Sequence, residues 1–104
     1  MSMPVYYIVK SVISPEHSAA FDEWYHKKHI PDMIARSGCK GARRFRAITP
    51  EDKFMYMAVY EFADMATFQK YQGSEDKKAL VADFMKHFGD QAELRSSSWE
   101  QIYP

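Results

Sequence analysis

Histidines and tyrosines supply the side chains of this sequence that could move a proton near neutral pH. His29 ends the run FDEWYHKKH (21–29), four residues after Tyr25 and next to a further aromatic, Trp24. The ordinary pKa of an imidazole is about 6.5, so His29 could be a general acid or base on a bound molecule. The alternative is a histidine that bonds to a free carbonyl at the end of a helix.

Tyrosines occur on two segments that the sequence predicts to be strands. Tyr60 is the tyrosine that we expect to assist His29, with Tyr7 next and Tyr56 on the same strand face as Tyr60. Because a buried phenol needs a partner for its hydroxyl, several phenols around one imidazole would form an acid–base pocket for a planar, oxygenated ligand. The alternative is that these rings only fill the core or a subunit interface.

Arg44 is the basic residue that we expect to contact a ligand. It lies on a predicted strand, where it shares one face with Arg46 and alternates with Arg43. A guanidinium on a covered sheet face must be paired, and the structural alternative is an ion pair with Glu61 or Glu93 across the sheet. The functional alternative is an anionic oxygen of a ligand, held by the guanidinium fork.

Metal-binding patterns are weak in this sequence. Asp22, His26 and His29 have helical spacings that could bring them to one ion, but a surface Asp–His pair explains the first two more simply. His87 lies close to Phe84, so it could face the same pocket, although a histidine near a helix end also complements the helix dipole. We therefore predict neither a metal nor a cofactor.

Length and composition limit the class of protein. The 104 residues suit one domain with one core, residues 1–104, and the apolar fraction of 46% excludes a disordered chain. Fourteen basic residues balance fourteen acidic ones, so no net field favours nucleic acid or an anionic membrane. No run approaches the roughly 20 apolar residues of a membrane span, and no signal-peptide pattern is present, which predicts a cytoplasmic protein.

The strands that would position these side chains are predicted from four runs of apolar and β-branched residues: 5–13, 41–48, 54–62 and the weaker 92–103. The run 54–62 (FMYMAVYEF) is apolar at almost every position, whereas a strand with one wet face would alternate. Both faces of this strand are therefore expected to be covered.

Helices are predicted between these strands. The first covers about 15–28, and Pro31 disfavours helical geometry in the residue before it, so this helix should end or kink near His29. The other helix starts and stops are given by local capping signals at Ser14, Gly38, Asp64, Ser74 and Gly89.

The resulting order β-α-β-β-α-β predicts a ferredoxin-like α+β fold, in which a four-stranded antiparallel sheet carries both helices on one face. The apolar content of 5–13 and 54–62 requires a cover for the other face. In so short a chain the simplest cover is a second copy, so we predict a twofold homodimer that packs sheet against sheet.

The segments WYHKKHIPDM (24–33), ARRF (42–45) and AVYEF (58–62) resemble the EthD-like branch of the dimeric α+β barrel superfamily, over nearly the whole chain. The resemblance implies a ferredoxin-like fold, a dimeric α+β barrel, and a pocket in each subunit between helices and sheet. It also favours His29 as a site residue. The chain departs from polyketide-cyclase-type members, which carry a histidine where YQGSEDK (71–77) stands here.

The leading hypothesis is a small cofactor-independent enzyme that acts by proton transfer, as an isomerase, cyclase or lyase, on an aromatic or polyketide-like small molecule. His29 would be the general acid/base, Tyr60 would assist, and Arg44 would orient an anionic oxygen. One alternative is a non-catalytic or auxiliary dimer that only binds its ligand. Another, implied by relatives on this fold, is a haem- or oxygen-dependent monooxygenase with His29 or His87 as axial ligand. The expected substrate contacts are Trp24, Tyr25, Tyr7, Arg44, Tyr56 and His87.

Overall fold

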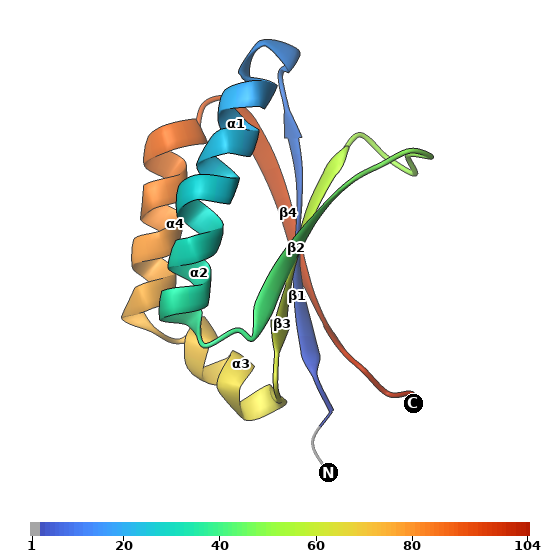
Figure 1. Cartoon of the computed structure of the whole chain (residues 1–104), viewed down its shortest axis with the longest axis vertical. Coiled ribbons are helices and arrows are strands. Elements are labelled where there is room, and N and C mark those ends of the chain that lie inside the picture. The colour runs from blue at the N-terminus through green and yellow to red at the C-terminus, as the bar shows by residue number, and fades with distance from the viewer. Residues whose placement is uncertain (1–2) are drawn as a thin grey trace.

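The computed structural model describes residues 3–104, in which four strands form one antiparallel sheet (Figure 1). The strands lie in the spatial order β2-β3-β1-β4. Their bounds are β1 (Val5–Ile13), β2 (Gly41–Arg46), β3 (Tyr56–Phe62) and β4 (Ala92–Glu100). This topology confirms the ferredoxin-like prediction, although β2, β3 and β4 are shorter than the predicted runs.

The loop between β2 and β3 includes the last residues of the predicted strand 41–48 and the first residues of the predicted strand 54–62. Its acidic side chains fold back onto β1, where Lys10 Nζ donates to Glu51 Oε1 at 2.6 Å and to Asp52 Oδ2 at 3.0 Å. The other carboxylate oxygen of Asp52 accepts from the backbone N–H of Phe54 at 2.8 Å. The Phe54 N–H is thus bonded to a side chain of the loop and not to a neighbouring strand, and the predicted strand 54–62 begins two residues later.

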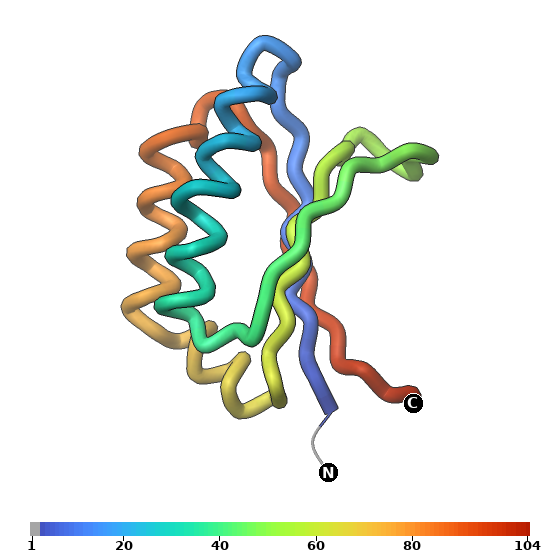
Figure 2. Tube along the Cα trace, viewed as in Figure 1, coloured from blue at the N-terminus to red at the C-terminus, as the bar shows by residue number. Residues whose placement is uncertain are grey.

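One face of the sheet carries all of the helices (Figure 2). Two of them are α3 (Met65–Gln72) and α4 (Glu75–Phe88). The side chains of Asp64 and Ser74 cap these helices, accepting from Thr67 N at 2.8 Å and Lys77 N at 3.1 Å. Among residues 3–104, no helix has both the length and the apolar character to cross a bilayer.

The first helical run continues through the proline that was expected to end it. It consists of the 3-10 turn η1 (Pro15–His17), α1 (Ser18–Trp24), the π turn η2 (Tyr25–His29) and α2 (Ile30–Ser37). The N–H of Ile30 bonds to the carbonyl of Tyr25, five residues back. In a regular helix the ring of Pro31 would clash with the carbonyl four residues back, and Pro31 has no N–H to donate to it. The wider π turn avoids this clash. Gly38, at φ 85°, then ends α2, as its sequence position predicted.

The core lies between the helices and the sheet and consists largely of aromatic rings. Phe21 of α1 meets Phe84 and Phe88 of α4 nearly at right angles, with ring centroids 6.0 and 5.1 Å apart. From the sheet side, Tyr60 and Phe62 of β3 are almost fully buried. Edge-to-face packing of this kind holds α1 and α4 at defined positions above the sheet.

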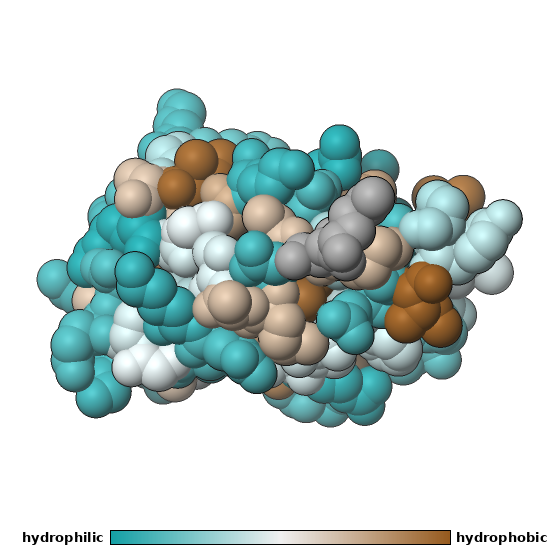
Figure 3. All heavy atoms as spheres, turned by 90° about the horizontal axis from the view of Figure 1, so that it is seen from below, coloured by the Kyte–Doolittle hydropathy of each residue, from teal (hydrophilic) through white to brown (hydrophobic). Residues whose placement is uncertain are grey.

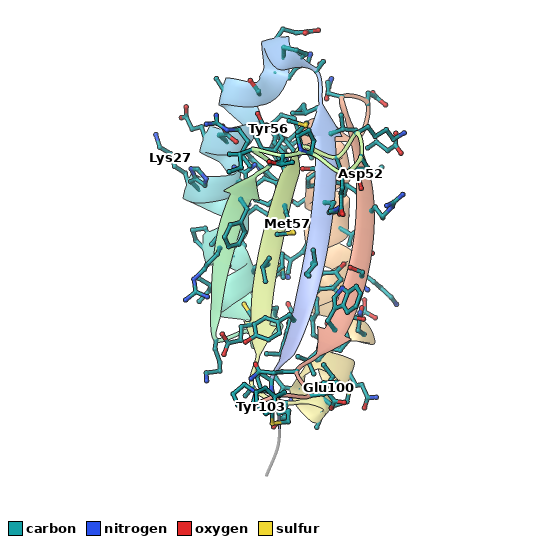
Figure 4. All side chains as sticks on the ribbon, turned by 90° about the vertical axis from the view of Figure 1, so that its right-hand side faces the viewer. Lys27, Asp52, Tyr56, Met57, Glu100 and Tyr103 are labelled. Atoms are coloured by element: carbon teal, nitrogen blue, oxygen red, sulfur yellow. The ribbon has the colours of Figure 1, made fainter. Side chains whose placement is uncertain are left out.

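The opposite face of the sheet carries no helix (Figure 4). Met57 lies near the middle of this face in Figure 4, and the strand registers place Ile8 and Val59 on the same side. The aromatic side chains of Trp99 and Phe45 on this face are exposed. The β2–β3 loop and the C-terminal segment project beyond the bare face in Figure 1, and hydrophobic atoms stand out on that side in Figure 3. Within one chain, the second face of β3 is therefore not covered.

Candidate functional site

A cavity of about 70 Å³ lies between the helices and the sheet. Its polar lining consists of one imidazole and four phenols, contributed by His29, Tyr7, Tyr25, Tyr60 and Tyr71; the rest of the lining is apolar. An apolar hollow with a few converging polar groups is the usual form of a small-molecule site. The sequence-based expectation of a pocket at this place in the fold agrees with this geometry.

The π turn places Tyr25 and His29 next to each other on the cavity wall. Their rings meet edge to face at 5.1 Å, and both side chains are buried. The helix continues for eight residues beyond His29, so no free carbonyl at a helix end is available for this histidine to cap. Single π turns recur at functional sites, and here the turn follows from Pro31 just beyond it.

The ring of His29 is held by packing. The indole of Trp24 stacks on it at 4.8 Å, with the two planes 17° from parallel. Nδ1 of His29 is buried and has no hydrogen-bond partner within residues 3–104. Trp24 itself does not line the cavity; it contacts His29 and not the space a ligand would occupy.

The protonation state of His29 follows from its burial. Loss of water lowers the pKa of His29 to about 4, against an opposing pull from the carboxylates of Asp83 and Asp32. The imidazole is therefore neutral at pH 7. In that state it can accept a proton from a bound molecule, which is the property that a general base requires.

The phenols have the complementary property. Burial raises the pKa of Tyr60 well above its ordinary value; the neighbouring phenol of Tyr25 adds to this rise without reaching hydrogen-bond geometry. Burial also raises the pKa of Tyr25 to about 12 and the pKa of Tyr7. The Tyr60 hydroxyl is buried and unpartnered in the described chain, and its ring lies 6.5 Å from that of His29. It is thus free to donate a hydrogen bond to an oxygen in the cavity.

Arg44 lies outside the cavity, and its predicted partners are wrong. Its Nη1 donates to Asp22 Oδ1 of α1 at 2.7 Å. The register pairs Arg44 with Ala58 on the face that the helices cover, whereas Glu61 and Glu93 point to the bare face. The guanidinium therefore reaches up to a helix, because no carboxylate on its own face of the sheet is within reach.

The same ion pair removes the metal alternative. Arg44 Nη1 is also 3.2 Å from His26 Nε2, so a guanidinium occupies the space between Asp22 and His26. His29 faces the cavity instead. Over residues 3–104, no three His, Cys, Asp or Glu side chains are placed to hold a metal ion.

Two more predicted contacts lie away from the cavity lining. Tyr56 packs beside the guanidinium of Arg44, whose central carbon is 5.6 Å from the phenol ring centroid. His87 sits near the surface end of α4, with Nδ1 2.8 Å from the carbonyl of Asp83 and its ring 5.3 Å from that of Trp24. The structural interpretation of His87, as a histidine near a helix end, agrees with this position.

The sequence did not single out Tyr71 or the mouth of the cavity. Tyr71 lines the cavity from α3, and its hydroxyl donates to Met33 Sδ at 3.4 Å. Tyr71 lies three residues after Phe68, a helical spacing that places both rings on the inner face of α3, so this spacing could have indicated Tyr71 as a cavity residue. The mouth is formed by three exposed apolar side chains of the lining from two elements, Val81 and Met85 of α4 and Leu94 of β4, and no local pattern marks them.

Comparison with solved structures supports the predicted resemblance. A protein of the ethyl tert-butyl ether D (EthD) family from Bacillus halodurans is similar with a TM-score of 0.68 and 26% identity, covering 91% of this chain and 97% of that chain. SnoaB, a cofactor-independent oxygenase from Streptomyces nogalater, superposes with a TM-score of 0.71 over 99% of this chain and 97% of its own. Its 9% identity extends the likeness to the fold alone.

A sequence relative is the core atranone cluster (CAC) protein 1 of Stachybotrys chlorohalonatus, 33% identical over 48 residues. That match covers 46% of this chain and only 20% of the length of the relative. The family model called "Domain of unknown function (DUF4286)" matches residues 4–102. A match over nearly the entire chain shows that the protein belongs to the DUF4286 family.

Proposed function

We propose that the protein is a small enzyme that uses its own side chains to move a proton on an aromatic or polyketide-like carbonyl compound. The observation that carries this proposal is the presence of two buried, unpartnered polar atoms in the lining of one cavity: Nδ1 of His29, on the helical side, and the hydroxyl of Tyr60, on the sheet. One is a neutral base and the other is a protonated donor, which are the two groups that an enolate-forming step needs. Arg44, bound to Asp22, has no part in it.

In the proposed reaction, His29 takes the proton from the carbon next to a carbonyl group. The electron pair of the broken C–H bond forms a C=C bond, and the carbonyl oxygen gains a negative charge that the Tyr60 hydroxyl stabilises by a hydrogen bond. The imidazolium then returns the proton. Return to the same carbon gives hydrogen exchange; in a substrate with a C=C bond between the β and γ carbons the enolate is an extended dienolate, and return to its γ carbon moves the C=C bond, so the net change is an isomerisation. Burial disfavours the imidazolium, so it opposes the first transfer and favours this return, and the hydrogen bond from Tyr60 to the enolate oxygen must offset the cost of the first transfer.

The cavity does not fit the haem alternative. An engineered protein cavity of about 150 Å³ holds one benzene molecule, so the space of about 70 Å³ beside His29 is far too small for a porphyrin. His87 is bonded to Asp83 near the surface, outside this space. Two rivals remain: an oxygen-dependent monooxygenase without haem, and a protein that binds the ligand without converting it. The second differs from the proposed enzyme only in turnover.

Hydrogen exchange in D₂O tests the proposal. The protein is incubated with alkyl- or aryl-substituted 1,3-diketones, and the loss of the proton signal between the carbonyls is followed by NMR. We expect the wild type to accelerate exchange, His29→Gln to be slower by about 100-fold or more, and the surface variant His26→Gln to match the wild type. Equal rates in wild type and His29→Gln would contradict the proposal. If the wild type binds a diketone without accelerating its exchange, the interpretation as a ligand-binding protein without this activity is favoured.

We also propose that the bare sheet face is the contact between two copies of the chain. Support comes from the apolar side chains on that face, above all Met57 at its middle (Figure 4) and the exposed indole of Trp99. Met57→Arg should then give a monomer in sedimentation experiments, while Ile34→Arg, on the exposed side of α2, should leave the dimer intact. A wild-type monomer at micromolar concentration would contradict this assignment.

A further inference from the structure

The cavity beside His29 has no charged lining. No Asp, Glu, Lys or Arg of the described chain lines it, and burial keeps His29 and Tyr60 in their neutral forms. A carboxylate or ammonium group moved into such a space would lose its water without gaining a counter-charge. The part of a ligand that enters must therefore be uncharged.

The cavity is also too small for a whole substrate. Its volume of about 70 Å³ compares with about 150 Å³ for a cavity that holds benzene. This space accommodates a carbonyl group and the carbon next to it, which are the reacting atoms. The rest of the ligand must lie across the mouth.

The mouth is apolar and partly open to water. Val81 and Met85 are one helical turn apart on α4, and their side chains are 49% and 55% exposed. Leu94 of β4, 39% exposed, points to the helix side of the sheet and completes the rim. Exposed apolar side chains that continue the wall of a cavity are suited to covering an apolar chain.

Together these features define a class of ligand. We infer that the substrate is an uncharged amphipathic carbonyl compound that enters carbonyl first and lays an apolar chain across Val81, Met85 and Leu94. A β-keto ester with an alkyl chain is the simplest member of this class, and the free β-keto acid is excluded by its charge. The inference rests on the proposed function for the identity of the reacting end, whereas the charge and chain requirements rest on the cavity and its mouth.

Binding calorimetry with a homologous series tests the inference. The probes are methyl acetoacetate, methyl 3-oxohexanoate, methyl 3-oxooctanoate and the 3-oxooctanoate anion. Each added methylene should tighten binding by about threefold while the chain lies on the rim. The anion should bind about 100-fold more weakly than its methyl ester, since it would bring an unpaired charge into the cavity.

Rim variants locate the effect. Leu94→Asp and Val81→Asp should each abolish the gain in affinity with chain length. Ile34→Asp, an exposed apolar position on α2, is the matched control and should keep the gain. Circular dichroism checks that each variant folds. If Leu94→Asp, on a strand, unfolds, Val81→Asp, on the surface of a helix, still tests the inference.

Three results would overturn the inference: equal affinity along the series, an anion that binds as well as its ester, or no binding of any ester at millimolar concentration. The proposed function fails separately. If chain-length dependence is seen and no hydrogen exchange occurs, proton transfer is rejected and the ligand class stands. If short diketones exchange and affinities are flat, the ligand class is rejected and proton transfer stands.

Discussion

The imidazole of His29 and the indole of Trp24 form a parallel stack, 4.8 Å between ring centroids, directly behind the cavity wall. Nδ1 of His29 has no hydrogen-bond partner in the described chain, so the stack and the edge contact with Tyr25 at 5.1 Å orient the ring. The same indole keeps water from the imidazole. The indole thus contributes both to the desolvation of the proposed base and, together with Tyr25, to its orientation.

Removing the indole should return water to the imidazole. We expect Trp24→Ala to raise the pKa of His29 from about 4 toward the ordinary value of about 6.5, because burial is the main cause of its depression. Trp24→Phe keeps a stacked ring and should keep most of the depression. The measurement is an NMR titration of the imidazole protons, with His29→Gln to assign the signal.

His87→Ala is the control for this titration, since it removes another ring that packs against Trp24 and leaves the stack of Trp24 on His29 in place. It should leave the pKa of His29 low. A pKa that stays at about 4 in Trp24→Ala would mean that the helices and strands, without the indole, already exclude water.

The low pKa of His29 also makes stability depend on pH. Well above pH 6.5, from about pH 8, this side chain binds almost no proton in either state and contributes nothing to the pH dependence. As pH falls toward 4, the unfolded chain gains a proton that the folded chain does not, so stability is lost, by about 3 kcal/mol at pH 4. The difference in unfolding free energy between wild type and His29→Gln, from urea titrations at pH 7 and pH 4.5, isolates this contribution; an equal difference at both pH values would contradict it.

Tyr60→Phe should stabilise the protein while it slows the reaction. The Tyr60 hydroxyl is buried without a partner in the described residues, and such a group costs roughly 1–3 kcal/mol, so deleting it should raise the unfolding free energy by about 1 kcal/mol. The same deletion removes the proposed donor to the enolate oxygen. Thermal unfolding and the exchange assay measure the two effects.

Tyr71→Phe is the matched control for Tyr60→Phe. The Tyr71 hydroxyl already donates to the sulfur of Met33, a weak acceptor, and it has no role in the proposed reaction. Both stability and exchange rate should change little. If Tyr60→Phe proves clearly less stable than the wild type, its hydroxyl has a partner and is not reserved for a ligand.

Local signals in the sequence were sufficient to predict most of the fold. Asp64 and Ser74 cap helices and Gly38 ends one because each of these roles needs only the backbone within a few residues. Pro31 was different. Its rule concerns regular helices, and the π turn that accommodates it also buries Tyr25 and His29 in the core, which a local pattern does not reveal.

The candidate site could be predicted only in part, for geometric reasons. Tyr56 and Tyr60 share a strand face, but four residues of strand span about 13 Å, so only Tyr60 reaches the cavity. The mouth of the cavity could not be predicted, because its side chains come from α4 and β4, which meet only through tertiary packing. The partner of Arg44 required knowing which helix lies above β2, since the strand pattern gives the direction of a side chain and not what it meets.

The ion pair between Arg44 and Asp22 gives the last prediction. The Arg44 side chain is only 10% exposed while Asp22 is 42% exposed, so the guanidinium is the group that depends on the pair. A double-mutant cycle with Arg44→Gln and Asp22→Asn, read by urea unfolding, should give a coupling of about 1 kcal/mol.

The Arg44 guanidinium also lies 4.5 Å from the ring centroid of Tyr25, and its charge partly offsets the effect of burial on the pKa of Tyr25. Arg44→Gln should therefore raise that pKa further, which keeps the phenol protonated. Exchange in Arg44→Gln should consequently stay near the wild-type rate in spite of lower stability. The matched cycle of Arg44 with Glu61 should show no coupling, because the two side chains point to opposite faces of the sheet. A large loss of exchange in folded Arg44→Gln would instead place the guanidinium in the reaction, as the sequence alone had suggested.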